Sequence, residues 1–187
     1  MKISRQIDCD CKSLKKYFNN LFSLLEKCSR EESEATVEAY DADETNCSDS
    51  YQRISHLIKP DMLINIYSLL DFWLEKICKN HKESRKLTLS HTEIKGKSDL
   101  NSYHKYLTKY VCLNLNEVQN SYSQLDNLRK VRNCFIHSGG HIPENKEKDF
   151  AGIKHINLVG SLIYIKPEFI WESLSHAKKY LIAATGN

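Results

Sequence analysis

Two residues that could perform acid–base and phosphate chemistry, Arg132 and His137, stand five positions apart in the segment RNCFIH. The imidazole of histidine exchanges protons near neutral pH, and a guanidinium offers phosphate a planar fork of donors. RNA carries its own nucleophile, the 2′-hydroxyl. Its cleavage therefore requires a base, an acid for the leaving 5′-oxygen and positive charge on the phosphorane oxygens, but no metal ion. The pair has the residue types that this reaction requires.

An amphipathic helix is predicted to position this pair. At about 100° per residue, one broad apolar arc contains Leu125, Leu128, Val131, Phe135 and Ile136. The Gly139-Gly140 pair indicates a left-handed cap at the end of the helix. Arg132 falls inside the arc, where a guanidinium is costly unless an acid, an interface or an anion receives it. Asn133 and His137 share another face, where Asn133 could orient the imidazole or hydrogen-bond the substrate.

The segment resembles the R-x4-6-H motif of the HEPN superfamily, in its common form with a polar residue after the arginine. The resemblance extends loosely over most of the chain. It implies a mainly helical bundle, a short β-hairpin before the C-terminal helix, and metal-independent endoribonuclease activity without a cofactor. Arg132, Asn133 and His137 would be the catalytic residues, and the products would carry a 2′,3′-cyclic phosphate and a 5′-hydroxyl. Such enzymes are often toxins or antiviral effectors.

The resemblance also implies a homodimer. On an ideal helix Arg132 and His137 point about 140° apart, so one protomer converges them poorly. HEPN enzymes dimerise so that two motifs face one cleft, which would give RNA a composite active site. Some members pair with an antitoxin, so an antitoxin or regulatory protein is a further expected partner. One alternative is a catalytically silent module that dimerises and binds a nucleotide, RNA or a protein. A second alternative is an unrelated helical adaptor, in which the motif is a coincidence. Arg132 would then form a buried ion pair, and His137 would cap the end of its helix.

The most hydrophobic predicted helix, residues 60–80, is expected at the centre of the bundle because it is apolar nearly all round. Asp71 and Glu75 mark its narrow polar strip. The LLDFWL setting of Asp71 is similar to the acid-bearing second helix of many HEPN proteins, and a carboxylate there would give Arg132 a partner. A solvent-facing strip is the alternative for Asp71 and the favoured interpretation for Glu75.

The rest of the chain predicts further helices and one hairpin. Apolar residues at helical spacing predict helices over residues 10–38, 51–59 and 100–111, the last capped by Ser98 or Asp99. A final helix is predicted from Pro167, with an apolar stripe of Ile170, Leu174, Ala177, Leu181 and Ala184. Two apolar runs, 153–158 and 162–166, predict a β-hairpin about residues 159–161. The acidic segment 41–50 and the basic segment 81–97 predict loops, of which the second could touch phosphate. The polar segment 141–149 predicts a third loop.

Three tyrosines and one further histidine have two interpretations. Tyr103, Tyr106 and Tyr110 could stack on RNA bases, but core packing is favoured. His141 is a second candidate imidazole, although an exposed loop position is the favoured interpretation.

Length and composition predict a single globular domain over residues 1–187. A net charge of +3 permits nucleic-acid binding without arguing for it. The seven cysteines lack zinc-site spacing, so we expect reduced thiols, several of them buried, and a cytoplasmic location. No apolar run reaches the ~20 residues of a membrane span.

Overall fold

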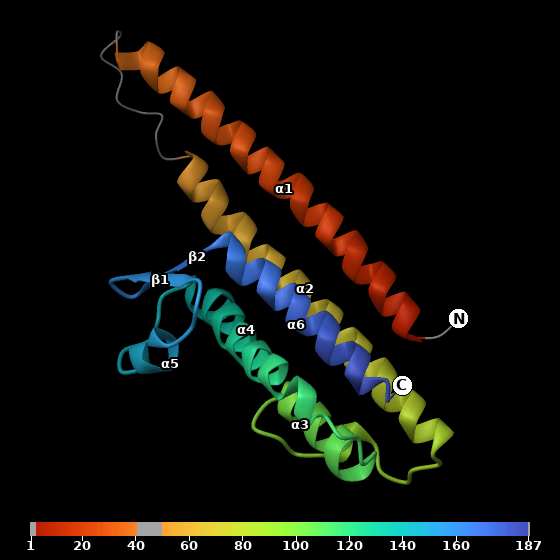
Figure 1. Cartoon of the computed structure of the whole chain (residues 1–187). Helices are drawn as coiled ribbons and strands as arrows, with labels where there is room; N and C mark the ends of the chain where they lie inside the picture. Colours follow the sequence, from red (N-terminus) through yellow and green to blue (C-terminus); the bar gives the residue numbers. More distant parts are fainter. Residues whose placement is uncertain (1–2, 41–49, 187) are drawn as a thin grey trace.

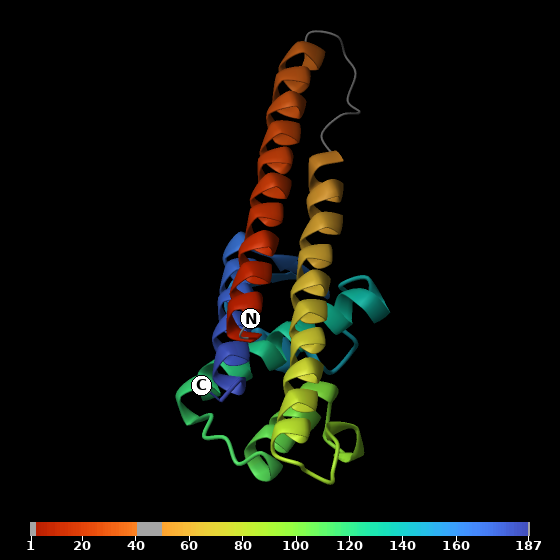
Figure 2. The ribbon, with the colours of Figure 1, turned by 90° about the vertical axis from the view of Figure 1, so that its right-hand side faces the viewer.

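Two long antiparallel helices, α1 (Ile3–Tyr40) and α2 (Ser50–Ser84), run along the molecule (Figure 1). The structure is a computed structural model that describes residues 3–40 and 50–186, with side chains for 3–30 and 54–186. Turned by 90°, the molecule shows both helices extending beyond the remaining elements at one end (Figure 2). The acidic segment expected to be a loop lies, except for its last residue, outside the described residues; that residue, Ser50, begins α2.

The prediction of two separate helices on either side of Pro60 is wrong, because α2 is continuous through this proline. Proline has no backbone N–H, so it deprives the His56 carbonyl of its helical hydrogen bond. Pro60 is buried, and α2 packs along α1, α6 and β2, which offsets the loss. The helix also includes the first residues of the segment 81–97. His81 extends it because its buried ring bonds the Ala184 carbonyl at 2.9 Å.

The core forms where α6 (Pro167–Ala184) lies against α1, α2 and α4 (Gln119–Ser138). The predicted apolar stripe of α6 is buried throughout and consists of Ile170, Leu174, Ala177, Leu181 and Ala184. As expected, α2 is central, since it also contacts α3 (Asp99–Lys105). The predicted mainly helical fold, with a two-stranded hairpin before the last helix, is confirmed. No helix in the described part of the chain is long and apolar enough to span a membrane.

The segment before α4 confirms the helix predicted over residues 100–111. The Ser98 hydroxyl caps α3 by accepting a hydrogen bond from the Asn101 amide at 3.2 Å. A π-helical turn, Tyr106–Tyr110, continues α3. Tyr103 and Tyr106 are buried as core residues, whereas Tyr110 is 41% exposed.

The segment after α4 contains the predicted hairpin and one helix that was not predicted. Strands β1 (Ile156–Val159) and β2 (Leu162–Ile165) pair antiparallel. The polar stretch before them, expected to be a loop, contains the short helix α5 (Glu147–Ala151). Its single buried residue, Phe150, packs in the core and holds this helix in place. The sequence did not predict the helix because one apolar residue does not make a helical pattern.

The described cysteines are free thiols, and three of them, Cys11, Cys78 and Cys134, are buried. Removal from water raises the pKa of the Cys11 thiol to about 11 and that of Cys78 to about 12. They act as small apolar side chains, as the sequence predicted.

Candidate active site

The predicted left-handed cap ends α4 and fixes the position of His137. Gly139 and Gly140 have φ angles of 58° and 88°. The Gly139 amide bonds the Phe135 carbonyl at 3.0 Å, and the Gly140 amide bonds the Cys134 carbonyl at 3.2 Å. The Gly140 carbonyl in turn accepts a hydrogen bond from the Ile163 amide at 3.0 Å, which ties the helix end to the hairpin.

His137 and Asn133 line a cavity of about 360 Å³ at this end of α4. Residues from the cap to α5 form the opposite wall, and both segments lie close together in Figure 1. His137 itself is exposed, while Asn133 is half-buried. The structure therefore places two of the three predicted catalytic residues in one cavity.

Three cationic side chains also line the cavity: Arg129, Lys130 and Lys146. Arg129 bonds the Asp126 carboxylate at 2.8 Å, and Lys130 lies 3.4 Å from the same group. Lys146 makes no salt bridge within the described part of the chain. With Asp149 the only carboxylate in the lining, the cavity favours anions.

The remaining wall is apolar and chemically inert. Pro143 and Phe150 line it, and Phe150 is 6% exposed. Cys134 also lines it and donates its thiol hydrogen to the His141 carbonyl at 3.2 Å. Burial raises the pKa of the Cys134 thiol, so the sulfur stays protonated and is a poor nucleophile. Among the described residues, His137 carries the only imidazole in the lining of this cavity, and imidazole is the side chain that most often serves as a general acid or base.

Arg132 does not line the cavity but faces α2. Its guanidinium carbon lies 5.2 Å from the centre of the Tyr67 ring, and its Nη1 donates to the Asn133 Oδ1 at 2.9 Å. Burial raises the pKa of Tyr67 to about 12, so the ring stays neutral beneath the cation. The Arg132 Nε is buried without a hydrogen-bond partner among the described residues. Ile136, expected in the apolar arc, is 44% exposed.

The structure does not bring Asp71 into hydrogen-bonding contact with Arg132. Within the described residues, no hydrogen bond or salt bridge joins the two. The polar group with the strongest effect on the Asp71 carboxylate is instead the Tyr103 hydroxyl. The residue as a whole is exposed, yet its carboxyl group loses enough water for its pKa to be raised. The Tyr103 hydroxyl and, more weakly, the Arg132 guanidinium act in the opposite direction and lower the pKa of Asp71.

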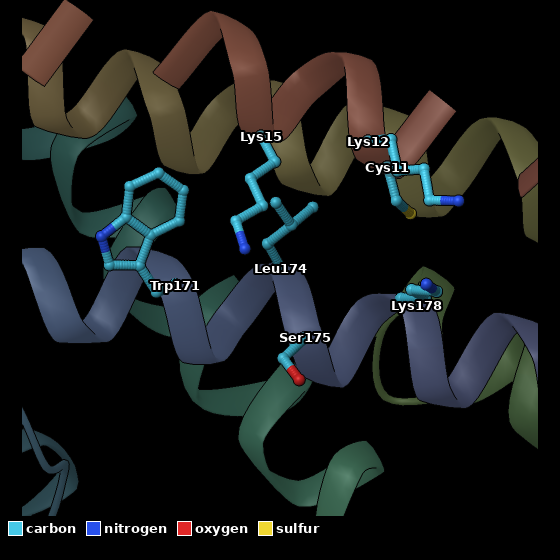
Figure 3. A pocket seen from close by; sticks show the side chains of 7 residues that line it. All are labelled: Cys11, Lys12, Lys15, Trp171, Leu174, Ser175 and Lys178. Atoms are coloured by element: carbon cyan, nitrogen blue, oxygen red, sulfur yellow. The ribbon is translucent and has the colours of Figure 1, made fainter. Parts of the chain in front are cut away.

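A second cavity, of about 250 Å³, lies between α1 and α6 and contains none of the predicted site residues (Figure 3). Lys12 and Lys178 bridge to Asp8 at 2.7 and 2.5 Å, while Lys15 reaches toward Leu174. These salt bridges lower the pKa of Asp8 to about 2. The cavity is cationic with an apolar floor, and the described residues of its lining include no histidine or carboxylate.

Sequence reasoning missed the cations of the His137 cavity. The signal for Arg129 was available, since residues 129, 133 and 137 follow the four-residue spacing of one helix face. Lys146 and Phe150 carried no such signal, because the chain brings them to α4 through a turn and a short helix.

In the described part of the chain, no three His, Cys, Asp or Glu residues are placed to hold a metal ion. No protein-family model, curated protein or solved structure matches this chain.

Proposed function

We propose that the protein is an endoribonuclease that cleaves RNA by attack of the 2′-hydroxyl on the adjacent phosphate. The observation that carries the proposal is the placement of His137 in a cavity rich in cations. The imidazole would take the proton of the 2′-hydroxyl or give one to the leaving 5′-oxygen. Products with a 2′,3′-cyclic phosphate and a 5′-hydroxyl would follow.

The remaining features of the cavity suit an RNA phosphate and its nucleoside. Arg129, Lys130 and Lys146 would attract the phosphate, and the Asn133 amide would hydrogen-bond it. The volume of about 360 Å³ lies within the range of small-ligand sites, and the wall of Pro143 and Phe150 offers apolar contact.

A single imidazole cannot act as base and acid at the same moment, so the proposal includes a homodimer. In it, the His137 of a second copy would supply the other proton transfer. A cytoplasmic toxin or antiviral effector, controlled by an antitoxin or another regulatory protein, is the biological role that the motif suggests.

The test compares His137→Ala with a matched histidine. His141 is also exposed, but it does not line the cavity, and its Nδ1 bonds the Ser161 hydroxyl at 3.0 Å. We expect His137→Ala to lower the cleavage rate of labelled single-stranded RNA at least about 100-fold. His141→Ala should retain the rate of the unaltered protein. Full cleavage by a folded His137→Ala protein would refute the proposal.

A second candidate function is RNA binding without cleavage. The cations of the cavity favour it, because they would bind phosphate whether or not a complete set of acid and base is present. Salt-sensitive RNA binding with intact RNA after long incubation would support this function and exclude the first.

A further inference from the structure

The guanidinium of Arg132 is largely committed to contacts inside the protein. It stacks on Tyr67, its Nη1 bonds Asn133, and its Nε is buried. Of its three nitrogens, only Nη2 is neither buried nor bonded to a described residue. Because Arg132 also lies outside the cavity lining, it is poorly placed to hold a phosphate beside His137 of the same chain.

The bond from Arg132 fixes the orientation of the Asn133 amide. A side-chain amide has one acceptor oxygen and one donor nitrogen, and here the oxygen is occupied by the Arg132 Nη1 at 2.9 Å. The Asn133 Nδ2 has no partner among the described residues and is not buried away from solvent. Since Asn133 lines the cavity, the group that it offers to a ligand is a donor. Without Arg132 the amide could turn its oxygen toward the phosphate and repel it.

The cations of the cavity differ in how freely they can bind an anion. Arg129 already holds the Asp126 carboxylate through Nε and Nη2, both at 2.8 Å. Lys130 lies farther from that carboxylate, at 3.4 Å, and Lys146 has no carboxylate partner within the described residues. Lys130 comes from α4 and Lys146 from the opposite wall, so a phosphate between them would meet positive charge from two sides.

We infer that Lys130, Lys146 and the Asn133 Nδ2 bind the scissile phosphate beside His137, and that Arg132 is a positioning residue that acts through Asn133. The inference rests on the proposed function and assigns the substrate contacts of that site. It also gives Arg132 a different role from the direct phosphate contact that the motif resemblance implies.

A double-mutant cycle tests the role of Arg132. Arg132→Met, Asn133→Ala and the double variant are compared in cleavage of RNA and in binding of a non-cleavable 2′-O-methyl RNA. If Arg132 acts through Asn133, the double variant should lose no more activity or affinity than Asn133→Ala alone. If the two losses multiply, Arg132 contacts the RNA itself and the inference is overturned.

A readout without RNA checks the same contact. In ¹⁵N-labelled protein, Arg132→Met should shift the side-chain amide signals of Asn133. It should leave those of Asn127 in place, because the amide of Asn127 bonds Gln124 instead. Unshifted Asn133 signals would show that Arg132 does not hold this amide and would overturn its positioning role.

Single lysine variants test the phosphate contacts. Lys130→Gln and Lys146→Gln should each weaken binding of 2′-O-methyl RNA about tenfold and reduce its salt dependence. Lys148→Gln, an exposed lysine of α5 outside the cavity lining, should do neither. Equal affinities for all three variants would overturn the phosphate assignment alone. Selective weakening in a protein that never cleaves RNA would uphold the contacts and remove the proposed function.

Discussion

The hydroxyl of Tyr103 on α3 interacts with the carboxylate of Asp71 on α2. Loss of water around the carboxylate outweighs this interaction, so the pKa of Asp71 is raised. The pKa of Tyr103 is raised as well, by burial first and by the neighbouring carboxylate second. The pair links two helices of the bundle on the side of α2 that also carries Tyr67, the residue beneath Arg132.

Asp71→Ala should cost at most about 1 kcal/mol of unfolding free energy, because it removes only the interaction with the Tyr103 hydroxyl. Loss of one partner of a buried ion pair would cost roughly 3–5 kcal/mol. Asp71→Asn should be at least as stable as the unaltered protein at pH 7, because the amide keeps an oxygen near the Tyr103 hydroxyl without a partly dehydrated charge. Denaturant unfolding measures both variants. A loss near 4 kcal/mol in Asp71→Ala would show that Asp71 does pair with Arg132.

The glycine cap provides a matched pair of substitutions. Gly139→Ala should cost about 1 kcal/mol, since its φ of 58° is strained for alanine but nothing lies within 4 Å of the added methyl group. Gly140→Ala should cost at least about 2 kcal/mol more, because its methyl group would lie 2.5 Å from the Phe135 ring. Thermal unfolding compares them, and equal melting temperatures would contradict the close packing of Phe135 on Gly140.

RNA cleavage should survive an excess of EDTA. In the proposed reaction the 2′-hydroxyl is the nucleophile, and proton transfer and phosphate binding belong to His137 and the lysines of its cavity. Initial rates are compared with EDTA alone and with EDTA followed by excess magnesium. Loss of cleavage on chelation, with recovery on addition of magnesium, would show a different class of reaction.

The folded protein should lose stability between about pH 7 and pH 5.5. Burial lowers the pKa of His91, His104 and His176 below the ordinary value of about 6.5. As the pH falls through 6.5, the unfolded chain takes up protons that the folded chain does not, so the unfolding free energy decreases. Each group can contribute at most about 1.4 kcal/mol per pH unit.

A variant of His104 gives the sharpest test of this pH dependence, because the folded structure holds its ring on both sides. The ring centres of His104 and Tyr122 lie 4.1 Å apart, and the His104 Nδ1 bonds the Tyr180 hydroxyl at 2.8 Å. In His104→Gln, the slope of unfolding free energy against pH should be flatter, whatever the absolute stability of the variant. An unchanged slope would mean that His104 takes up its proton equally in the folded and unfolded states.

Local patterns predicted most of the fold. The spacing of Ile170, Leu174 and Leu181 predicted the buried face of α6, and the Gly139-Gly140 pair predicted the end of α4. Each of these signals is short-range, since it depends on residues within a turn or two of one another. Pro60 misled the prediction of a helix start because the packing that stabilises a proline inside a helix comes from other parts of the chain.

The candidate site was only partly predictable for the same reason. The four-residue spacing of Asn133 and His137 placed them on one face, and both line the cavity. No local pattern could show that Tyr103, and not Arg132, would be the main polar neighbour of Asp71. Nor could one show that Lys146 would lie beside α4. The direction of the Arg132 side chain depended on the aromatic ring available on α2, which only the folded structure reveals.

The position of α6 has a consequence for how the protein folds. This helix contributes packing surface to α1, α2 and α4 at once, although it follows α1 by more than a hundred residues. Most contacts in helical bundles are local, and such proteins usually fold fast. Here the apolar sides of three earlier helices are not fully buried until residues 167–184 pack against them. A chain in which α6 has not yet docked therefore exposes an apolar surface that is prone to self-association.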